Sequence, residues 1–554
     1  MIYNKYISKK EALKCFKKYD ESIIKNNSLY IERNLIALKE YFDHMYDFVD
    51  KSIKLDDEQR IAILKDEDYN IILAGAGSGK TTTLAAKVKF LVDIGKVNPK
   101  DIVVISFTNK AVDELKQRIN NDFKIDCLIC TFHKFGLLLF NNRPNIISDS
   151  YLIIKDILKD YLYSDKKLLK KLIFHFKKYF NIPIYILLFS NINKFNYYKD
   201  KILSFFNLRK NDNYIDNFAH LCTNFISQFK TKGYQEKDFL SITKSNEKEE
   251  IFIELIMKTY KKYQQILSSN NSLDFEDIIN NAYLKLDDLS LNYKYIIVDE
   301  YQDISYQRFN LIKKASDISG AKIIAVGDDW QTIYSFSGSE ISLFTDFEKI
   351  VGYTSISLIT NTYRNSQQLI DIAGNFIMCN KNQIKKQLKS VKQIINPVII
   401  VYYIDRVKSL NKCLENMRPN TKILLLGRYN FDIKYYLGRY FKKQNEKIIS
   451  IKFPYLDITF LSVHSAKGLG FDNVIILNCN SGIYGFPSKV ETDSIFNLIT
   501  NNNQLEEERR LFYVALTRTK NKVYILSDKN NPSIFVEEIK KFKNVTFMWY
   551  HIFP

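Results

Sequence analysis

The stretch Tyr69 to Asp93, "YNIILAGAGSGKTTTLAAKVKFLVD", decides the fold class. It begins with an apolar run, passes through a glycine-rich turn and continues with the spacing of an amphipathic helix. A second apolar run and helix follow at once in "DIVVISFTNKAVDELKQRI", residues 101–119. Apolar strands that alternate with amphipathic helices are typical of a parallel sheet built from βαβ units. We therefore expect an α/β fold.

The same alternation returns later in the chain. Further strand-like runs are "YKYIIVDE" (293–300), "AKIIAVGDD" (321–329), "NPVIIVYY" (396–403), "TKILLLGRY" (421–429), "ITFLSVH" (458–464) and "FDNVIILN" (471–478). Between about 141 and 270 it lapses into long helical segments rich in Lys, Tyr, Phe and Ile. We expect a helical lead-in over 1–50, a first lobe over 51–140 and 271–355, a helical insertion over 141–270, and a second lobe over 356–554.

Composition excludes several classes of protein. The 554 residues are 46% hydrophobic, but no run approaches 18 uncharged apolar residues and the first residues lack an apolar signal region. Seven cysteines are too few for a disulfide framework in a chain of this length. Cys127 and Cys130 form a CxxC without a second pair, so a buried strand explains them better than zinc. We expect a cytoplasmic protein with no membrane association.

The charge is strongly positive. The 81 Lys and Arg residues exceed the 62 Asp and Glu residues, which gives a formal net charge of +19. Such an excess favours a polyanionic partner. The abundance of Ile, Lys, Asn, Tyr and Phe is also what an AT-rich genome produces, so charge alone leaves both explanations open.

The turn "AGAGSGKT" has the form and the setting of a phosphate-binding loop between a strand and a helix. Successive backbone N–H groups would surround the phosphates at the helix N-terminus. The Lys80 ammonium would reach the β and γ oxygens, and the Thr81 hydroxyl would bind Mg²⁺. The nucleotide-binding residues expected from this segment are Ala74, Gly75, Ala76, Gly77, Ser78, Gly79, Lys80, Thr81 and Thr82.

An acidic pair completes this site. In "IIVDEYQD", Asp299 ends an apolar strand and would hold Mg²⁺, while Glu300 would polarise the attacking water. Arg364 in "NTYRNSQQLIDIA" and Arg518 in "EEERRLFYVALTRTK" would stabilise charge on the transferred phosphoryl group, although each taken singly also fits a surface ion pair. Together these residues predict hydrolysis of a nucleoside triphosphate.

The stretch "VGDDWQTIYSFSGS", Val326 to Ser339, combines two kinds of chemistry. A buried strand ends in two aspartates and a glutamine, which suit a phosphate site. Tyr334 and Phe336 follow, and their flat rings suit the stacking of nucleic-acid bases. Core packing is the alternative for these two rings.

Ten motifs, in order from about Leu55 to about Lys520, resemble those of the UvrD/Rep-like superfamily 1 helicases. They are "LDDEQ", "AGAGSGKT", "SFTNKAVDEL", "ICTFHKF", "DFEDII", "VDEYQD", "VGDDWQTIYSFSG", "NTYRNS", "VHSAKGLGFD" and "EEERRLFYVALTRTK". The form "GDDWQ" and the lead-in "YFDHMYDFVDKSIKLDDEQR" look most like the helicase IV branch. The resemblance implies two RecA-like lobes, with ATP in the cleft between them and single-stranded nucleic acid across both.

The resemblance also implies roles for individual residues. Gln59 would read the adenine edge and Tyr363 would stack on its ring, while Gln331 would sense the γ-phosphate beside Arg364 and Arg518. The residues implied to contact nucleic acid are Phe107, Thr131, His133, Tyr334, Phe336, His464 and Lys467. Among them, His464 and Lys467 match the motif that couples lobe closure to the DNA backbone.

The chain departs from its relatives in two places. Many relatives have Glu, which contacts the nucleotide sugar, where Gly470 stands, so a strict preference for ATP is in doubt. UvrD and Rep carry a large accessory subdomain before the "VHSAKG" motif, but here only 37 positions separate Gly427 from His464. We expect a strand and a helix in that interval, and little or no accessory subdomain.

These observations predict an ATP-dependent 3′→5′ DNA helicase or translocase that uses ATP and Mg²⁺. Its substrate would be single-stranded or partially duplex DNA. Two alternatives remain: an ATP-switched nucleic-acid clamp or sensor that recruits a protein partner such as a nuclease, and an RNA helicase.

Overall fold

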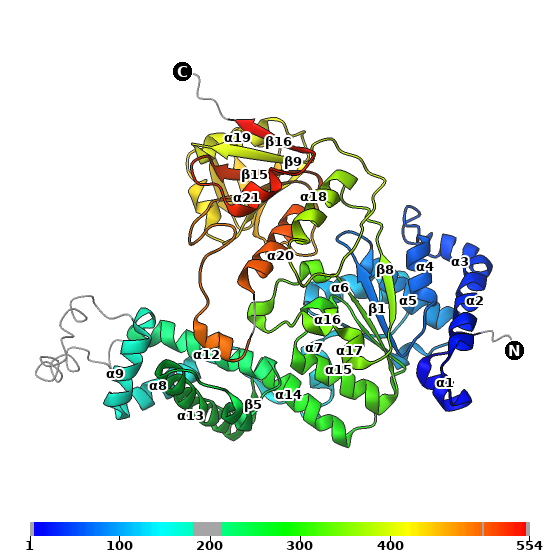
Figure 1. Ribbon diagram of the computed structural model, residues 1–554, viewed down its shortest axis with the longest axis horizontal. Helices are drawn as coiled ribbons and strands as arrows, with labels where there is room; N and C mark the ends of the chain where they lie inside the picture. Colours follow the sequence, from blue (N-terminus) through cyan, green and yellow to red (C-terminus); the bar gives the residue numbers. More distant parts are fainter. Residues whose placement is uncertain (1–4, 181–211, 501–502, 550–554) are drawn as a thin grey trace, which may run out of the picture.

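The computed structural model describes residues 5–180, 212–500 and 503–549. Two mainly parallel sheets form two lobes, and a helical subdomain lies beside the first lobe (Figure 1). The expected α/β class with two parallel-sheet lobes is confirmed. No helix in the described ranges is long and apolar enough to cross a membrane.

The first sheet has six strands in the order β3-β2-β6-β7-β1-β8, and all its neighbours are parallel. Its strands are β1 (Tyr69–Ala74), β2 (Ile102–Ser106), β3 (Leu128–Thr131), β6 (Tyr295–Val298), β7 (Lys322–Gly327) and β8 (Ser355–Ile359). Parallel strands end at one edge of a sheet. The glycine-rich turn after β1, the acidic pair after β6 and the loop after β7 therefore converge there.

Helices cover both faces of this sheet. One face packs against α5 (Lys80–Asp93) and α6 (Asn109–Lys116), and the other against α7 (Phe132–Leu138), α14 (Phe275–Lys285) and α15 (Tyr306–Ser319). Ahead of β1 come α1 (Lys9–Phe16), α2 (Glu21–Ala37), α3 (Lys39–His44) and α4 (Asp57–Leu64). Phe42 and Tyr46 pack with Phe90 of α5 in a separate small core.

The first lobe extends beyond the expected boundary at 355. Strand β8 pairs in parallel with β1, so that Ile71 lies opposite Ile356, and it forms the edge of the first sheet. Its side chains alternate between buried and exposed. One face of this edge strand is open to solvent, and its sequence "SISLI" therefore lacks the continuous apolar run by which the central strands were recognised.

The described part of the helical insertion contains α8 (Tyr151–Ser164), α9 (Lys166–His175), α12 (Asp216–Thr231) and α13 (Glu247–Ser269). Residues 181–211 of the expected insertion lie outside the described residues. The core of this subdomain is aromatic, with Phe218 and Phe225 of α12 edge-on to Phe252 of α13. Lys230 of α12 is buried and ion-paired with Asp274 and Asp277 at the start of α14, which joins the subdomain to the first lobe.

The second sheet has eight strands in the order β11-β12-β13-β10-β14-β15-β9-β16. They are β9 (Val398–Tyr403), β10 (Lys422–Gly427), β11 (Phe441–Gln444), β12 (Lys447–Ser450), β13 (Asp457–Ser462), β14 (Phe471–Ile476), β15 (Thr519–Asp528) and β16 (Val545–Trp549). One face packs against α18 (Gln367–Ile377), α20 (Gln504–Leu516) and α21 (Ile534–Ile539), and the other against α19 (Arg406–Glu415).

The interval between Gly427 and His464 differs from the expectation of a strand and a helix. The helix is replaced by a 3₁₀ turn, Asp432–Tyr435, and the antiparallel hairpin β11-β12 that leads into β13. The hairpin continues the sheet by main-chain pairing with β13. This compact connection holds no accessory subdomain.

A long segment of the second lobe crosses to the helical subdomain, as the orange chain in Figure 1 shows. Ile495 and Ile499 are buried in the core of that subdomain. Asp493 accepts a hydrogen bond from Lys248 of α13 at 2.7 Å and lies 3.3 Å from the Lys178 ammonium. The second lobe is thereby anchored to the insertion as well as to the first lobe.

Candidate functional site

The glycine-rich turn joins β1 to α5, and Lys80 and Thr81 are the first two residues of that helix. Gly77 and Gly79 have φ angles of 74° and 79°, in the left-handed region that favours glycine. A Cβ on Gly77 would lie 2.6 Å from the Cβ of Arg364, and one on Gly79 would lie 2.9 Å from Nε2 of Gln59. The backbone of this turn therefore lies directly against two other predicted nucleotide-site residues.

The acidic pair lies beside the turn, with Asp299 buried and Glu300 partly buried. Burial and the adjacent Glu300 together raise the pKa of Asp299 to about 7, although the Lys80 ammonium opposes them. For Glu300, burial is outweighed by Lys80, Lys467 and a hydrogen bond from Gln302, which together lower its pKa to about 2. Lys80 thus acts electrostatically on both carboxylates, as a shared phosphate site requires.

The Asp299 carboxylate fits a cation that the sequence predicts. Its Oδ1 is buried and has no hydrogen-bond partner among the described residues. A buried carboxylate oxygen with unused lone pairs is a suitable donor for Mg²⁺, a hard cation that prefers oxygen. Thr81, in the first turn of α5, supplies the hydroxyl expected as a second ligand.

Gln302 was not singled out from the sequence, although it lies within "VDEYQD". Its side-chain Nε2 donates a hydrogen bond to Glu300, and its Oε1 accepts one from the Asp328 N–H at 2.9 Å. Glu300 itself has φ 51°, an uncommon conformation for a residue with a side chain. Gln302 therefore fixes the orientation of Glu300 relative to the loop after β7.

Three predicted sensor residues from the two lobes meet at this edge. Gln331 donates a hydrogen bond from Nε2 to Asp328 at 2.7 Å, and its Oε1 accepts one from the Arg518 guanidinium at 3.0 Å. Arg364 donates to the carbonyls of Leu469 and Gly468. Burial, with the nearby Arg364, lowers the pKa of Arg518 to about 9, so it keeps its charge at neutral pH.

The predicted adenine-side residues lie on the other flank of the turn. Gln59 donates to the Ser78 carbonyl at 3.1 Å and caps α4 reciprocally with Asp56. The Tyr363 ring is 56% exposed, and its hydroxyl donates to Asp56 at 2.7 Å. Asp56 therefore holds both predicted adenine contacts, a link that the sequence did not reveal.

Gly470 lies close to one of the arginines. A Cβ at this position would be 3.2 Å from Nε of Arg364. The glutamate that many relatives have at this position would start its side chain beside Arg364. Because residue 470 is glycine, the Arg364 guanidinium has no carboxylate neighbour there.

The residues predicted to contact nucleic acid form two groups. In the first, the rings of Tyr334, Phe336 and His464 lie edge-on or tilted to one another, with centroids 5.4–6.1 Å apart. Phe336 is 59% exposed, whereas Tyr334 is largely covered and donates a hydrogen bond from its hydroxyl to the His464 carbonyl. Phe336 presents the open ring of this group, and Tyr334 joins the two lobes beneath it.

The second group lies on the first lobe. The Phe107 ring packs 5.1 Å from Phe132, with the Arg308 guanidinium 5.2 Å from its centroid. The Thr131 hydroxyl caps α7 by accepting from the Lys134 N–H, so in this structure it serves the helix. Burial, reinforced by Arg308, lowers the pKa of His133 to about 4, and its ring is therefore neutral at pH 7.

Lys467 differs from the expectation of direct contact with the DNA backbone. Its ammonium is ion-paired with Asp303 of the first lobe and donates to the Gln331 carbonyl at 2.8 Å. It also lies 4.9 Å from the centroid of Tyr334. Because this charge is enclosed between the lobes, Lys467 links them and does not face the surface.

A further aromatic cluster lies close to the first group and was not recognised from the sequence. Tyr429 and Phe431, just after β10, stack with centroids 4.9 Å apart, and Tyr484 lies edge-on to both. Arg428 covers Tyr429 and contributes to lowering the pKa of His464. In a chain with 37 Tyr and 39 Phe residues, nothing local marked these three rings.

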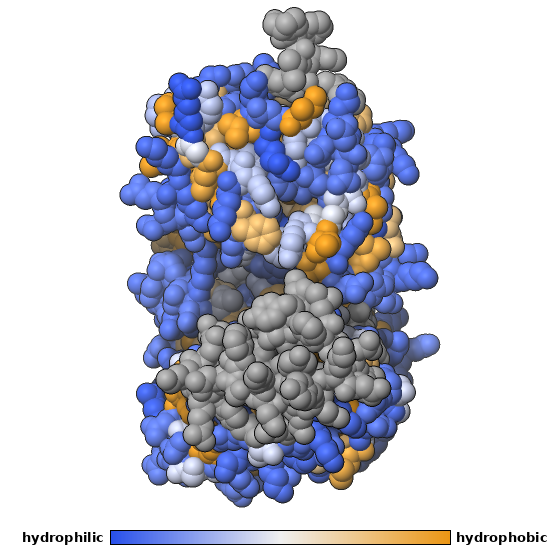
Figure 2. Space-filling view, turned by 90° about the vertical axis from the view of Figure 1, so that its left-hand side faces the viewer, coloured by the Kyte–Doolittle hydropathy of each residue, from blue (hydrophilic) through white to orange (hydrophobic). Residues whose placement is uncertain are grey.

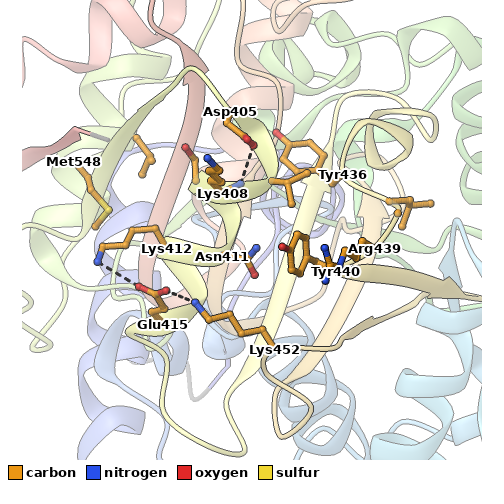
Figure 3. A pocket seen from close by; sticks show the side chains of 15 residues that line it. Asp405, Lys408, Asn411, Lys412, Glu415, Tyr436, Arg439, Tyr440, Lys452 and Met548 are labelled. Carbon is orange, nitrogen blue, oxygen red and sulfur yellow. Dashed lines mark hydrogen bonds and ion pairs between the residues drawn. The ribbon is translucent and has the colours of Figure 1, made fainter. Parts of the chain in front are cut away.

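The surface around the second lobe is predominantly polar. In Figure 2, hydrophobic residues are scattered among hydrophilic ones over the face that is turned toward the viewer. A cavity of about 870 Å³ lies beside α19. Its lining residues, which include Asn411, Tyr440 and Lys452, are drawn in Figure 3. None of the residues predicted from the sequence lines it.

Comparison with known proteins agrees with this geometry. The UvrD/REP helicase N-terminal domain matches residues 55–351, more than half of the chain, and the UvrD-like helicase C-terminal domain matches residues 437–530. The chain is 27% identical over 546 residues to DNA helicase IV of Escherichia coli, covering 95% of this chain and 75% of that protein.

Two other relatives show how the similarity extends. A probable DNA helicase II homolog of Mycoplasma capricolum is 31% identical over 62% of this chain, which corresponds to 44% of that protein. The ATP-dependent DNA helicase Rep of Buchnera aphidicola from Schizaphis graminum is 25% identical over 84% of this chain and 63% of its own length. The two lobes, the convergence of the residues predicted for a nucleotide site, and the matches to both family domains together show that the chain belongs to the UvrD/REP helicase family.

Proposed function

We propose that this protein is a DNA-stimulated ATPase that moves 3′→5′ along single-stranded DNA and can separate duplex DNA ahead of it. The observation that carries this proposal is the loop after β7. Within six residues it places Gln331 in contact with Arg518 of the opposite lobe and Phe336 on the exposed surface. One short segment can thus report the state of the nucleotide site to a ring suited to base stacking.

The chain's own residues account for the steps of hydrolysis. Lys80 and the N–H groups of the glycine-rich turn would bind the phosphates, and Thr81 and Asp299 would hold Mg²⁺, which would supply positive charge to the phosphate site. Glu300, whose low pKa keeps it ionised, orients and polarises the attacking water. Arg364 and Arg518 then stabilise the charge that develops on the transferred group.

The adenosine side of ATP would lie between Gln59 and Tyr363. The Gln59 side chain accepts a hydrogen bond from the Asp56 N–H, and the Tyr363 hydroxyl donates one to the Asp56 carboxylate, so the amide and the ring are both held by Asp56 beside the glycine-rich turn. Since residue 470 is glycine, the chain offers no carboxylate there for the sugar. We therefore propose that ATP is favoured through the base and phosphates more than through the ribose.

Grip on the strand would come from flat rings and from polar groups on both lobes. Phe336 supplies the open stacking face, with His464 and Tyr334 packed around it. Stacking on an aromatic ring accepts any base, at roughly 1–3 kcal/mol per base, so the protein would not read sequence. A 3′→5′ direction is what membership of the family implies.

One observation favours a second candidate, an ATP-switched clamp that recruits a protein partner such as a nuclease. The interval before β13 holds a hairpin where larger relatives carry an accessory subdomain. A clamp would close on DNA and hydrolyse ATP without travelling. Both candidates use the same nucleotide site, so only movement distinguishes them.

Arrival at a labelled strand end would separate the two candidates. On oligonucleotides of increasing length with a fluorophore at the 5′ end, a 3′→5′ motor produces a lag that grows in proportion to length. The same strands labelled at the 3′ end show prompt dissociation without that lag. A clamp gives no length-dependent lag with either label. Repeating the assay with RNA strands of the same sequence tests the remaining alternative, an RNA helicase.

A further inference from the structure

The segment between α18 and β9 returns from the second lobe to the nucleotide site of the first. The Lys389 N–H donates to the Thr360 carbonyl at 3.0 Å, and the Thr362 N–H donates to the Lys389 carbonyl at 2.8 Å. Leu388 lies against the glycine-rich turn, since a Cβ on Gly75 would be 2.6 Å from its side chain. This segment is therefore packed into the site, although none of its residues was predicted to belong to it.

Within the segment, Lys386 is a buried cation between two buried aspartates. Its Nζ lies 2.5 Å from Asp328 Oδ1 and 2.7 Å from Asp329 Oδ1, and the side chains of all three residues are at most 1% exposed. Burial opposes its charge, but Asp328 and Asp329 outweigh burial and raise the pKa of Lys386 above its usual value. Lys386 is therefore charged, and it is ion-paired with the two aspartates that follow β7.

Other residues of the same segment hold Asp329 and Trp330 in place. Asp329 accepts hydrogen bonds at 2.8 Å from the side chain of Gln383 and from the Ile384 N–H. Trp330 donates from its indole to the Ile384 carbonyl at 2.9 Å, and its ring lies 4.9 Å from the Lys386 ammonium. Residues 383–386 thus hold the turn that precedes Gln331 through hydrogen bonds and ion pairs.

Asp328 connects these contacts to Gln331, the predicted γ-phosphate sensor. Its Oδ1 is taken by Lys386, while its Oδ2 accepts the hydrogen bond from Gln331 Nε2 at 2.7 Å. With its amide nitrogen held there, Gln331 presents its Oε1 to Arg518. Without the bond to Asp328, the Gln331 amide could rotate and turn its nitrogen instead of its oxygen toward Arg518.

We propose that Lys386 is a positioning residue for ATP hydrolysis, which acts by holding Asp328 so that Gln331 keeps its oxygen toward Arg518. Its buried ammonium contacts Asp328, Asp329 and the Ala74 carbonyl, so it acts through other protein groups. Residues that act through one another give non-additive losses when both are removed. This inference rests on the proposed ATPase function.

The test compares Lys386→Met with Lys385→Met, which removes the same charge from the exposed neighbouring residue. In steady-state ATPase assays with saturating single-stranded DNA, Lys386→Met should lower kcat by at least about tenfold and change the KM for ATP by less than about threefold. Lys385→Met should match the wild type. Lys386→Arg, which keeps a cation between the aspartates, should retain most of the activity.

A double variant tests the route of action. In a Gln331→Ala background, Lys386→Met should lower kcat by no more than about twofold further, because the group it positions is already gone. A full multiplicative loss would show that Lys386 acts independently of Gln331 and would overturn the proposal. So would a Lys386→Met enzyme with wild-type kcat.

A second variant separates a loss of activity from a failure of Lys386→Met to fold. If Lys386→Met does not fold, the pair Asp329→Asn with Lys386→Met removes one buried negative charge along with the cation and leaves Asp328 in place. This pair should melt near the wild-type temperature and still show the low kcat; recovery of kcat together with stability would reduce Lys386 to a structural role. Absence of DNA-stimulated ATPase in the wild type would instead refute the proposed function.

Discussion

Arg518 of the second lobe and Gln331 of the first lobe share a hydrogen bond of 3.0 Å, from the guanidinium to the amide oxygen. Both side chains are buried. Arg518 is fixed further by the Val514 carbonyl at 2.9 Å, within its own lobe. Gln331 would sense the γ-phosphate, and Arg518 would stabilise the charge that develops on it. The same two residues also form a contact between the lobes, so we expect hydrolysis to depend on how the lobes are placed.

Replacing Arg518 by Lys should therefore impair chemistry more than binding. Lysine carries the charge but cannot bond Gln331, Val514 and the phosphate together, because it lacks the planar guanidinium. Loss of an arginine finger lowers kcat by roughly 10³-fold or more. Steady-state ATPase kinetics should show this fall in kcat, with the KM for ATP and the affinity for DNA little changed. A variant with normal kcat would remove Arg518 from the catalytic set.

Phe336→Ala should weaken binding to single-stranded DNA. The ring is the exposed member of the cluster with Tyr334 and His464, and loss of one stacked base corresponds to roughly 1–3 kcal/mol, or about 5- to 150-fold in Kd. Fluorescence anisotropy with a labelled oligonucleotide measures this change. Phe48→Ala, which removes a fully exposed ring from the N-terminal region, is the matched control and should bind normally. Equal affinities for the two variants would exclude Phe336 from the DNA surface.

Lys467→Ala should destabilise the protein. Asp303 is buried, and burial raises its pKa to about 6 even though the Lys467 ammonium opposes this. Removing the cation leaves a carboxylate enclosed near Glu300, a loss of about 3–5 kcal/mol for a broken buried pair. Chemical denaturation should report this difference. Adding Asp303→Asn should restore most of the stability, and failure of this rescue would show that the ion pair is not what Lys467 provides.

The stability difference between wild type and His464→Asn should depend on pH. Burial, together with Arg428 and Lys467, lowers the pKa of His464 from 6.5 to about 4. Because the unfolded imidazole takes up a proton first, the wild type should lose stability relative to the variant as pH falls from 6.5 toward 4, by roughly 1.4 kcal/mol at pH 5.5. Above pH 7 the difference should be constant. Denaturant titrations at several pH values measure it, and a difference independent of pH would contradict a buried neutral imidazole.

The central strands could be predicted from the sequence, and a nucleotide site could be proposed from it, because each has a strong local signal. Continuous apolar runs mark strands buried on both faces, and the glycine-rich turn and the acidic pair follow two of them directly. The edge strand β8 lacks such a run and was not predicted. Strand β15 was not predicted either, although the apolar run "VYIL" follows its polar start, "TKNK". Strand β16 and helix α21 were missed as well; both depend on pairing or packing with β9 and its neighbours.

The contacts that join the lobes were not predictable in the same way. Lys386 is one lysine among several in "KNQIKKQLKS", and only the return of that segment to the end of β7 gives it two aspartate partners. Lys467 was assigned to DNA from its motif, whereas its ammonium is enclosed with Asp303, far away in the sequence. Long-range burial of charge has no local pattern, so only the folded arrangement reveals it.

The measurement that tests the central claim most directly is the rate of ATP hydrolysis with and without single-stranded DNA, with Lys80→Ala as the blank. Coupling through the loop after β7 predicts strong stimulation by DNA, a loss of roughly 10²-fold or more in Lys80→Ala, and a weaker response in Phe336→Ala. Hydrolysis that is abolished in Lys80→Ala but indifferent to DNA would contradict the account, because the nucleotide site would then work without any link to the strand.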